Sequence, residues 1–198
     1  GSIHYHMPMQ FTFTGDLDVK AIEKTFQTII NRHEVLRTVF RTNDEDQAYQ
    51  HVLPASQWRL DISPDFDDEK AQEQYVRDFI NHPFDLENDH MLRVLLTPIG
   101  EQENELTMVF HHIASDGWSH HIFFEELTHI YSALVDGQTH GLEPLAIQYA
   151  DFAIWQKRHL SGQLLEQKMA YWEGKLKGVQ PLNLPTDYNR PKLQSMEG

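Results

Sequence analysis

The stretch ELTMVFHHIASDGWSHHIFFEELTHIYSALV, residues 105–135, combines a strand, a loop with two histidines and a helix. Its first six residues are mainly apolar, with a β-branched valine, which predicts a buried strand. Apolar residues then recur at helical spacing, at Ile122, Phe123, Leu127, Ile130, Tyr131 and Leu134. His111 and His112 therefore lie where a strand ends and a loop begins, a frequent position for reactive side chains.

The two histidines are expected to differ in role. Successive residues of a strand point to opposite faces, so only one of the pair can face a given cleft, leaving the other structural. Four residues after His112, Asp116 can anchor the loop by pairing with a basic group, and Gly117 allows the backbone to approach a substrate closely. An imidazole with the unperturbed pKa of about 6.5 can accept a proton at cellular pH.

The composition is that of a globular protein, with 198 residues of which 40% are hydrophobic and 23% charged. This length suits one packed domain. A formal net charge of −14 with scattered basic residues argues against nucleic acid or a membrane surface as a partner. The chain has no cysteine, which excludes disulfides and thiolate chemistry and fits a cytoplasmic location. No apolar run has the length of a membrane span or signal peptide.

Strands and helices alternate along the rest of the chain. Strands are expected over 9–14, 36–41, 49–53, 58–62, 91–97 and 105–110, and helices from Asp18, from the acidic stretch 65–69 and over 165–176. Early alternation followed by a hairpin predicts the α/β (α+β) class, a mixed β-sheet covered by helices. The aromatic residues Tyr149, Phe152, Trp155, Tyr171 and Trp172 have helical spacing, which favours core packing over ligand stacking.

Two alternative chemistries near the histidines are less favoured. His112, Asp116 and His120 are spaced four apart as metal ligands could be, but Gly117 and Trp118 disfavour a continuous helix from His112, so no metal site is expected. Ser115 and Ser119 could suggest a hydrolase, but the chain has no G-x-S-x-G elbow. A nucleophile three residues from its base would also need unusual geometry.

A second basic cluster lies in RHEVLRTVF, residues 32–40. Arg32 and His33 are interpreted as charges that offset the dipole at the end of a helix. Arg37 is expected at the start of a strand among apolar neighbours, where it needs an acidic partner. Asp116 is the obvious candidate.

Four segments in order resemble condensation domains of non-ribosomal peptide synthetases. HHIASDGWS is similar to their HHxxxDG signature, and RHEVLRTVF, IQYADFAIWQ and the pair YWEGKLKG with LNLPTDYNRP are similar to three further motifs, from Arg32 to Pro191. The residues Gly117-Trp118-Ser119 resemble peptide-bond-forming members more than epimerising or heterocyclising ones. A heterocyclising domain would have aspartate at the position of His112.

The resemblance implies a chloramphenicol acetyltransferase-like fold of two lobes with the active site in a tunnel between them. Donor and acceptor carrier proteins bring thioesters on phosphopantetheine arms, and the domain itself binds no cofactor. His112 would be catalytic and His111 structural, Asp116 would pair with Arg37, and the Gly117 amide would lie near the thioester. Ser115, Trp118 and Ser119 are substrate-proximal candidates.

The resemblance also sets an expected extent. Residues 1–2 are interpreted as an expression remnant, 3–180 as an N-terminal lobe without its leading helix, and 181–198 as a proline-rich strap toward a C-terminal lobe that is absent here. An adenylation domain would be adjacent. The isolated lobe is expected to be inactive and its uncovered surface to allow self-association. The alternatives are a non-catalytic carrier-protein-binding module and another acyltransferase with the His-x-x-x-Asp pattern.

Overall fold

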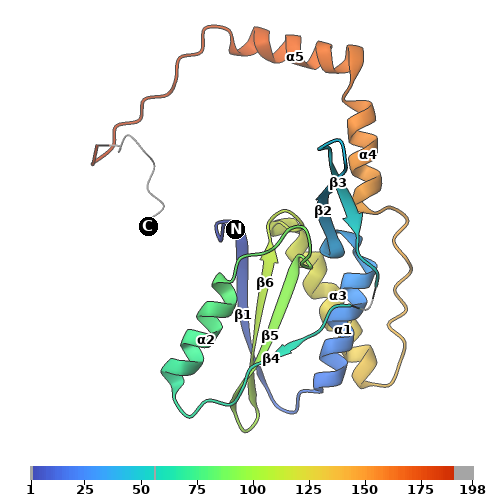
Figure 1. The fold of residues 1–198 in the computed structure, drawn as a ribbon, viewed down its shortest axis with the longest axis vertical. Helices are drawn as coiled ribbons and strands as arrows, with labels where there is room; N and C mark the ends of the chain where they lie inside the picture. The colour runs from blue at the N-terminus through green and yellow to red at the C-terminus, as the bar shows by residue number, and fades with distance from the viewer. Residues whose placement is uncertain (1, 56, 190–198) are drawn as a thin grey trace. The chain divides into compact units, whose positions relative to one another are not determined.

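The computed structural model describes residues 2–55 and 57–189 and divides the chain into two units, residues 1–153 and 154–198 (Figure 1). In order, the elements are β1 (His6–Thr14), α1 (Val19–Arg32), the 3-10 helix η1 (Glu34–Arg37), β2 (Thr38–Thr42), β3 (Ala48–Val52), β4 (Asp61–Ile62), α2 (Glu69–Asn81), β5 (Leu92–Gly100), β6 (Glu103–His111), α3 (Gly117–Val135), α4 (Tyr149–His159) and α5 (Gly162–Leu176).

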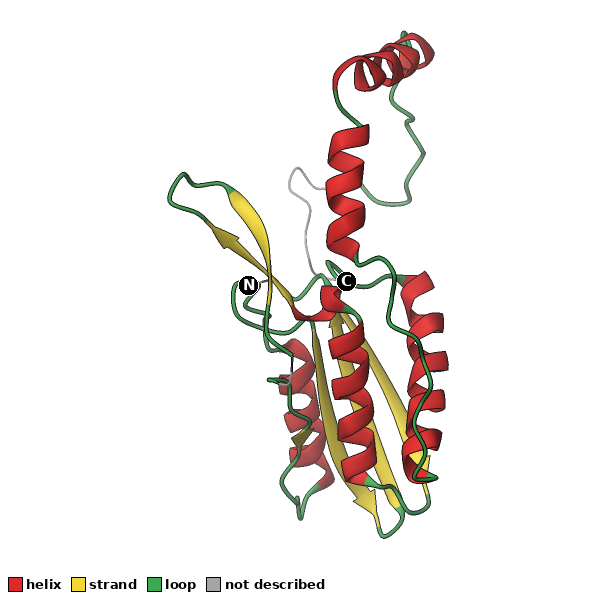
Figure 2. Ribbon diagram, turned by 90° about the vertical axis from the view of Figure 1, so that its right-hand side faces the viewer, coloured by secondary structure: helices red, strands yellow, loops and turns green. Residues whose placement is uncertain are grey.

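A four-stranded sheet in the order β1-β6-β5-β4 forms the centre of the first unit. β6 is antiparallel to both β1 and β5, and β4 is parallel to β5, so the sheet is mixed. β2 and β3 form a separate antiparallel hairpin that extends away from the main sheet (Figure 2). The expected fold class, a mixed sheet covered by helices, is confirmed.

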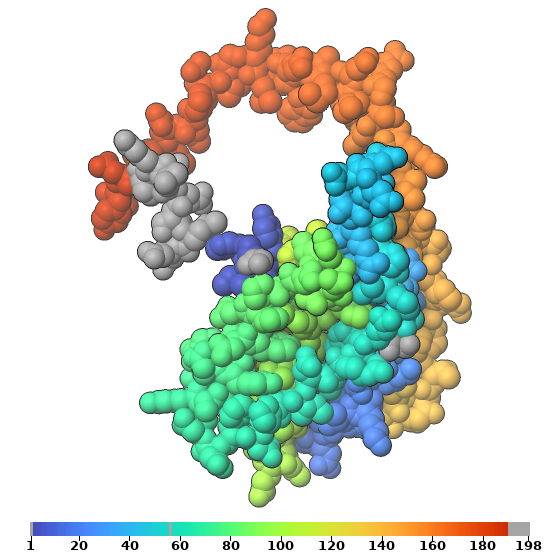
Figure 3. Space-filling view, in the orientation of Figure 1, coloured from blue at the N-terminus to red at the C-terminus, as the bar shows by residue number. Residues whose placement is uncertain are grey.

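The core lies between this sheet and the helices α1 and α3. The amphipathic face of α1 is fully buried there, as its spacing predicts, and Asp18 caps the helix by accepting a hydrogen bond from the Ala21 amide at 2.9 Å. Alternate residues of β5 and β6 supply the other side of the core; the cluster includes Ile22, Phe26, Ile29, Ile30, Leu92, Val94, Leu96, Leu106, Met108, Phe110, Phe123, Leu127 and Ile130. α2 lies over the opposite face of the sheet (Figure 1), and its residues form part of the outer surface in the space-filling view (Figure 3).

Several predicted elements have different bounds in the structure, and three of the differences matter here. Residues 36–41 are not one strand, because Glu34–Arg37 form a 3-10 turn and β2 begins at Thr38. The strand predicted over 58–62 is reduced to Asp61–Ile62, since Trp58 is buried and its indole N–H donates to the Leu92 carbonyl at 2.9 Å. α2 begins at Glu69 after its cap Asp68, later than the acidic stretch indicates.

The aromatic residues after residue 148 are exposed, so the prediction that they pack in a core is wrong. Tyr149, Phe152, Trp155, Tyr171 and Trp172 are 41–58% exposed. Helical spacing correctly places helices α4 and α5, but it does not determine what covers their apolar side chains. Residues 181–189 contain no helix or strand, and the rest of the predicted strap lies outside the described residues. Within the described ranges, no helix combines the length and apolarity needed to cross a membrane.

Candidate active site

His111 is the last residue of β6 and its side chain is buried, with 7% of the residue exposed. Its backbone N–H donates to the Met91 carbonyl at 3.0 Å, and its ring Nδ1 accepts from the Ile113 amide at 3.1 Å. Burial lowers the pKa of His111, and the neighbouring imidazoles of His6 and His112 lower it further. The ring is therefore held neutral, with Nδ1 as the acceptor that shapes the following turn.

His112 differs from its neighbour because its side chain is exposed. Its backbone is nevertheless fixed, since its N–H donates to the Tyr5 carbonyl at 2.8 Å, directly before β1. The turn continues with a hydrogen bond from the Ala114 amide to the His111 carbonyl at 3.0 Å. The structure thus places one histidine inside and one outside, as strand alternation predicts.

An open cavity of about 350 Å³ lies beside His112. It is lined by residues of the loop 112–116 (the motif loop), of η1, of the first turn of α3 and of the start of α4: Val35, His112, Ile113, Ala114, Ser115, Asp116, Ser119 and Tyr149. The N-terminus of α3 borders this cavity, so the positive end of the helix dipole lies beside the histidine. Trp118 in the first turn of α3 is 81% exposed.

Asp116 is the N-cap of α3. Its Oδ1 accepts hydrogen bonds from the Ser119 amide at 2.8 Å and from the Ser119 hydroxyl at 2.6 Å, while the Ser119 hydroxyl also accepts from the Asp116 amide at 3.3 Å. These bonds from Ser119 lower the pKa of Asp116. The aspartate therefore holds the end of the loop by starting the helix.

The predicted ion pair between Arg37 and Asp116 is wrong for the part of the chain that the structure describes. Arg37 instead pairs with Glu34, Nη2 to Oε1 at 3.1 Å, and its Nη1 donates to the Leu53 carbonyl at 2.6 Å. The 3-10 turn places Glu34 three residues before the guanidinium, so the acid that Arg37 needs is supplied locally.

Sequence reasoning missed Glu126, which joins α1 to α3. Its carboxylate pairs with Arg32 Nε at 2.8 Å and with His33 Nε2 at 2.7 Å. Burial raises the pKa of Glu126, but the hydrogen bonds from His33 and Arg32 outweigh it and lower the pKa from the ordinary 4.5. The sequence did contain a signal for this contact. Glu126 lies between Phe123 and Leu127 on the apolar face of α3, where a carboxylate needs a partner.

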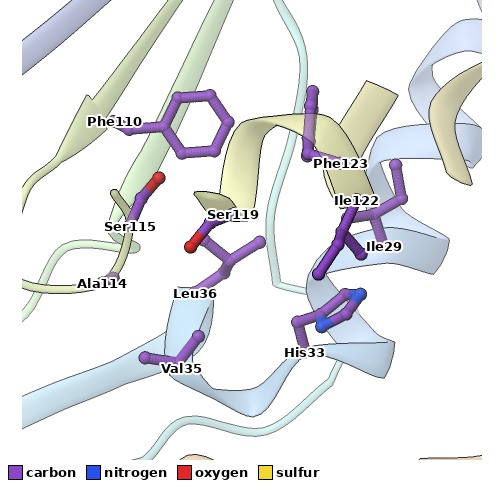
Figure 4. A pocket seen from close by; sticks show the side chains of 10 residues that line it. All are labelled: Ile29, His33, Val35, Leu36, Phe110, Ala114, Ser115, Ser119, Ile122 and Phe123. Carbon is purple, nitrogen blue, oxygen red and sulfur yellow. The ribbon is translucent and has the colours of Figure 1, made fainter. Parts of the chain in front are cut away.

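A second cavity, of about 130 Å³, lies below the motif loop between α1 and α3 (Figure 4). Its wall is mainly apolar: Ile29, Val35, Leu36, Phe110, Ala114, Ile122 and Phe123, with the polar side chains of His33, Ser115 and Ser119. Four of these residues, Val35, Ala114, Ser115 and Ser119, also line the open cavity beside His112. The Ser115 hydroxyl is buried and has no hydrogen-bond partner among the described residues.

The three residues considered as metal ligands are not brought together. Asp116 bonds to Ser119, and the ring of His120 packs against Phe110 with centroids 5.4 Å apart. Within residues 2–55 and 57–189, no group of three histidine, aspartate or glutamate side chains could hold a metal ion.

Comparison with known proteins places this site in a family. The family model described as the condensation domain matches residues 1–198. The chain is 44% identical to one of the linear gramicidin synthase subunits of Brevibacillus parabrevis and 36% identical to surfactin synthase subunit 1 of Bacillus subtilis, over 98% of its length in both cases. It spans only 3% and 5% of those two proteins.

Solved structures of proteins similar to this chain show the same fold. The X-domain in its complex with OxyB from teicoplanin biosynthesis superposes with a TM-score of 0.81 at 33% identity, over 94% of this chain and 42% of that one. The epimerization domain from the third module of tyrocidine synthetase B has the same fold, with a TM-score of 0.79 at 22% identity over 95% and 43% of the two chains. The chain therefore belongs to the condensation-domain family of non-ribosomal peptide synthetases and covers part of the N-terminal lobe of that fold.

Proposed function

We propose that this chain supplies the histidine-bearing side of an active site that forms peptide bonds between carrier-bound substrates. The observation that carries the proposal is His112, whose backbone is held by Tyr5 while its exposed imidazole borders an open cavity. A fixed backbone with a free imidazole suits proton transfer or orientation of a bound amine.

In the proposed reaction, the amine of the acceptor aminoacyl thioester attacks the carbonyl carbon of the donor thioester. The C–N bond forms, the C–S bond breaks, and the proton lost by the amine ends on the departing carrier thiol. His112 either accepts that proton as a general base or orients the amine toward the carbonyl. No enzyme nucleophile is needed, and the Gly117 amide at the start of α3 favours negative charge developing on the carbonyl oxygen.

The partners follow from the same proposal. Donor and acceptor carrier proteins would deliver their thioesters on phosphopantetheine, and a C-terminal lobe would complete the tunnel, with an adenylation domain in the same synthetase. The chain itself would bind no cofactor, and its location would be cytoplasmic. Ser115, Trp118 and Ser119 would contact or approach the substrates, and His111 would remain structural.

The test is substitution of His112 in a synthetase module that carries this chain. We expect His112→Ala to lower the rate of peptide formation between loaded carriers at least about 100-fold, the usual contribution of a general acid or base. His121→Ala is the matched control, because His121 is a highly exposed histidine of the first turns of α3. Product is measured by mass spectrometry of the carrier-bound peptide, and a fully active His112→Ala module would refute the proposal.

The pH dependence of the wild-type rate tests the general-base role of His112. A general base gives a rate that falls on acidification through the histidine range, so a rate without such an ionisation would refute that role and leave orientation of the amine.

A second candidate function is a binding module that recognises loaded carrier protein without turnover. The observation that favours it is the set of exposed aromatic side chains on α4 and α5, which offer an apolar surface to a partner protein. Titration of the isolated chain with loaded carriers, followed by product analysis, separates the two. Binding of the loaded carrier protein without formation of a peptide supports the binding module, whereas formation of a peptide supports the enzyme.

Self-association of the chain through its exposed aromatic side chains is tested by light scattering of the same sample.

A further inference from the structure

His6 begins β1 and is the strand partner of His111 in the antiparallel pairing of β1 with β6. Its ring Nδ1 lies 2.8 Å from the Ile80 carbonyl. A carbonyl only accepts, so Nδ1 carries the proton and donates it. Ile80 is in the last turn of α2, where carbonyls lack a partner within the helix. This hydrogen bond of His6 thus links the start of β1 to the end of α2.

The other side of the His6 ring belongs to a packed group of rings with Phe84 and His111. Phe84 is perpendicular to His6 at a centroid distance of 5.1 Å and nearly perpendicular to His111 at 5.5 Å, and the two imidazoles are 6.5 Å apart. The Arg93 guanidinium lies 4.1 Å from the Phe84 centroid. His6 Nε2 is buried without a hydrogen-bond partner among the described residues, so on this side packing alone holds the ring.

Two hydrogen bonds of backbone amides beside this group of rings fix the turn that carries the His112 side chain. The His112 amide donates to the carbonyl of Tyr5, the residue directly before His6. The Ile113 amide donates to His111 Nδ1, which can accept only while that nitrogen is unprotonated. A change of tautomer or a second proton on His111 would therefore remove one of the hydrogen bonds that hold the turn presenting His112.

We propose that His6 is a positioning residue for His112, because its ring, anchored at Ile80 and packed on Phe84, holds the His111 ring in the orientation in which Nδ1 accepts from the Ile113 amide and Nε2 carries the proton. The inference rests on the proposed function of His112. Among the described residues, the titratable groups that contact or act electrostatically on His111 are Tyr5 and His6 on the β1 side and His112 in the loop, while Arg93 on β5 lies over the Phe84 ring that packs on His111. α2 and the segment after it contribute Ile80 and Phe84, neither of which titrates.

The inference is tested by nitrogen-15 NMR of the histidine rings in the full 198-residue chain. In the wild type we expect His111 protonated on Nε2 and unprotonated on Nδ1. His6→Asn keeps an N–H for Ile80 but removes the ring, so His111 should populate both tautomers and titrate at a higher pH than in the wild type. His6→Phe keeps the ring and removes the neighbouring imidazole, so the tautomer should remain and the midpoint should rise. His4→Asn, at an exposed histidine two residues away, is the control and should change neither.

An unchanged His111 tautomer in His6→Asn would overturn the inference, and if that variant does not fold, loss of the His111 tautomer in His6→Phe, which keeps the packed ring, would do so. In the synthetase module, His6→Asn should lower kcat about tenfold while KM changes less than about twofold, as expected for misplaced catalytic groups. The NMR measurement needs no turnover, so its failure counts against His6 alone. A fully active His112→Ala module counts against the proposed function instead.

Discussion

Glu126→Gln tests the contact that joins α1 to α3 below the motif loop. The substitution keeps the size of the side chain and removes the charge that pairs with Arg32 and His33 at 2.8 and 2.7 Å. We expect a clear loss of folding stability, because two donors at the end of α1 lose their carboxylate acceptor while remaining largely shielded from water.

The size of the loss follows from the burial of the three side chains. They are 11%, 15% and 23% exposed for Glu126, Arg32 and His33. Breaking a fully buried pair costs about 3–5 kcal/mol, and breaking an exposed pair costs about 0.2–1 kcal/mol. Partial exposure places the expected loss between them, at about 2 kcal/mol. For a chain of this length that corresponds to a fall in Tm of about 4–8 °C.

The assay is urea unfolding followed by circular dichroism, with Glu125→Gln as the matched control. Glu125 is the adjacent residue of the same helix, and its pair with His121 is exposed on both sides, at 67% and 76%. Its substitution should change the free energy of unfolding by less than about 0.5 kcal/mol. Equal effects of the two substitutions would refute the reasoning.

The pH dependence of the Glu126→Gln effect has a definite sign. The pKa of Glu126 is lower in the folded chain than the ordinary 4.5, so the carboxylate stabilises the fold above that value. The difference between wild type and Glu126→Gln should therefore be full at neutral pH and decrease as the pH falls below 4.5. A difference that grows on acidification would contradict this assignment.

Three further outcomes are expected. Ser115→Ala should raise stability by up to about 1 kcal/mol in urea unfolding, because it removes a buried hydroxyl that has no partner among the described residues, and a loss would contradict this. Gly117→Ala should fold like the wild type by circular dichroism, since an added Cβ meets no atom within 4 Å, yet it should slow peptide formation; equal rates would argue against the proposed role of Gly117. Stability should fall between about pH 7.5 and about pH 5.5, because burial lowers the pKa of His111 and His90, so the unfolded chain takes up protons first; a flat profile would contradict this.

Local pattern was sufficient for much of the fold. The apolar spacing after Asp18 defines the buried face of α1, and the runs around residues 91–97 and 105–110 form the β5–β6 hairpin. Strand alternation also separates the buried His111 from the exposed His112. These features depend on residues close together in the chain, so periodicity and capping residues are enough to predict them.

The partners of charged groups could not be predicted in this way. Arg37 needs an acid, and the choice between Asp116 and Glu34 depends on whether residues 34–37 form a turn or a strand. Boundaries of a few residues are the least certain part of a sequence prediction. In this chain, the boundary between η1 and β2 decides which acidic residue pairs with Arg37.

By itself, the sequence determines most of the helices and strands, the order of the motifs and the position of the histidine pair at a strand end. Only the tertiary structure decides that Glu126 joins Arg32 to His33, that His6 packs with Phe84 against His111, and that the aromatic side chains of α4 and α5 are exposed. The physical reason is the separation along the chain between the residues that interact. Periodicity states which face of an element is apolar, whereas packing and ion pairing depend on ångström-scale distances between residues far apart in the chain.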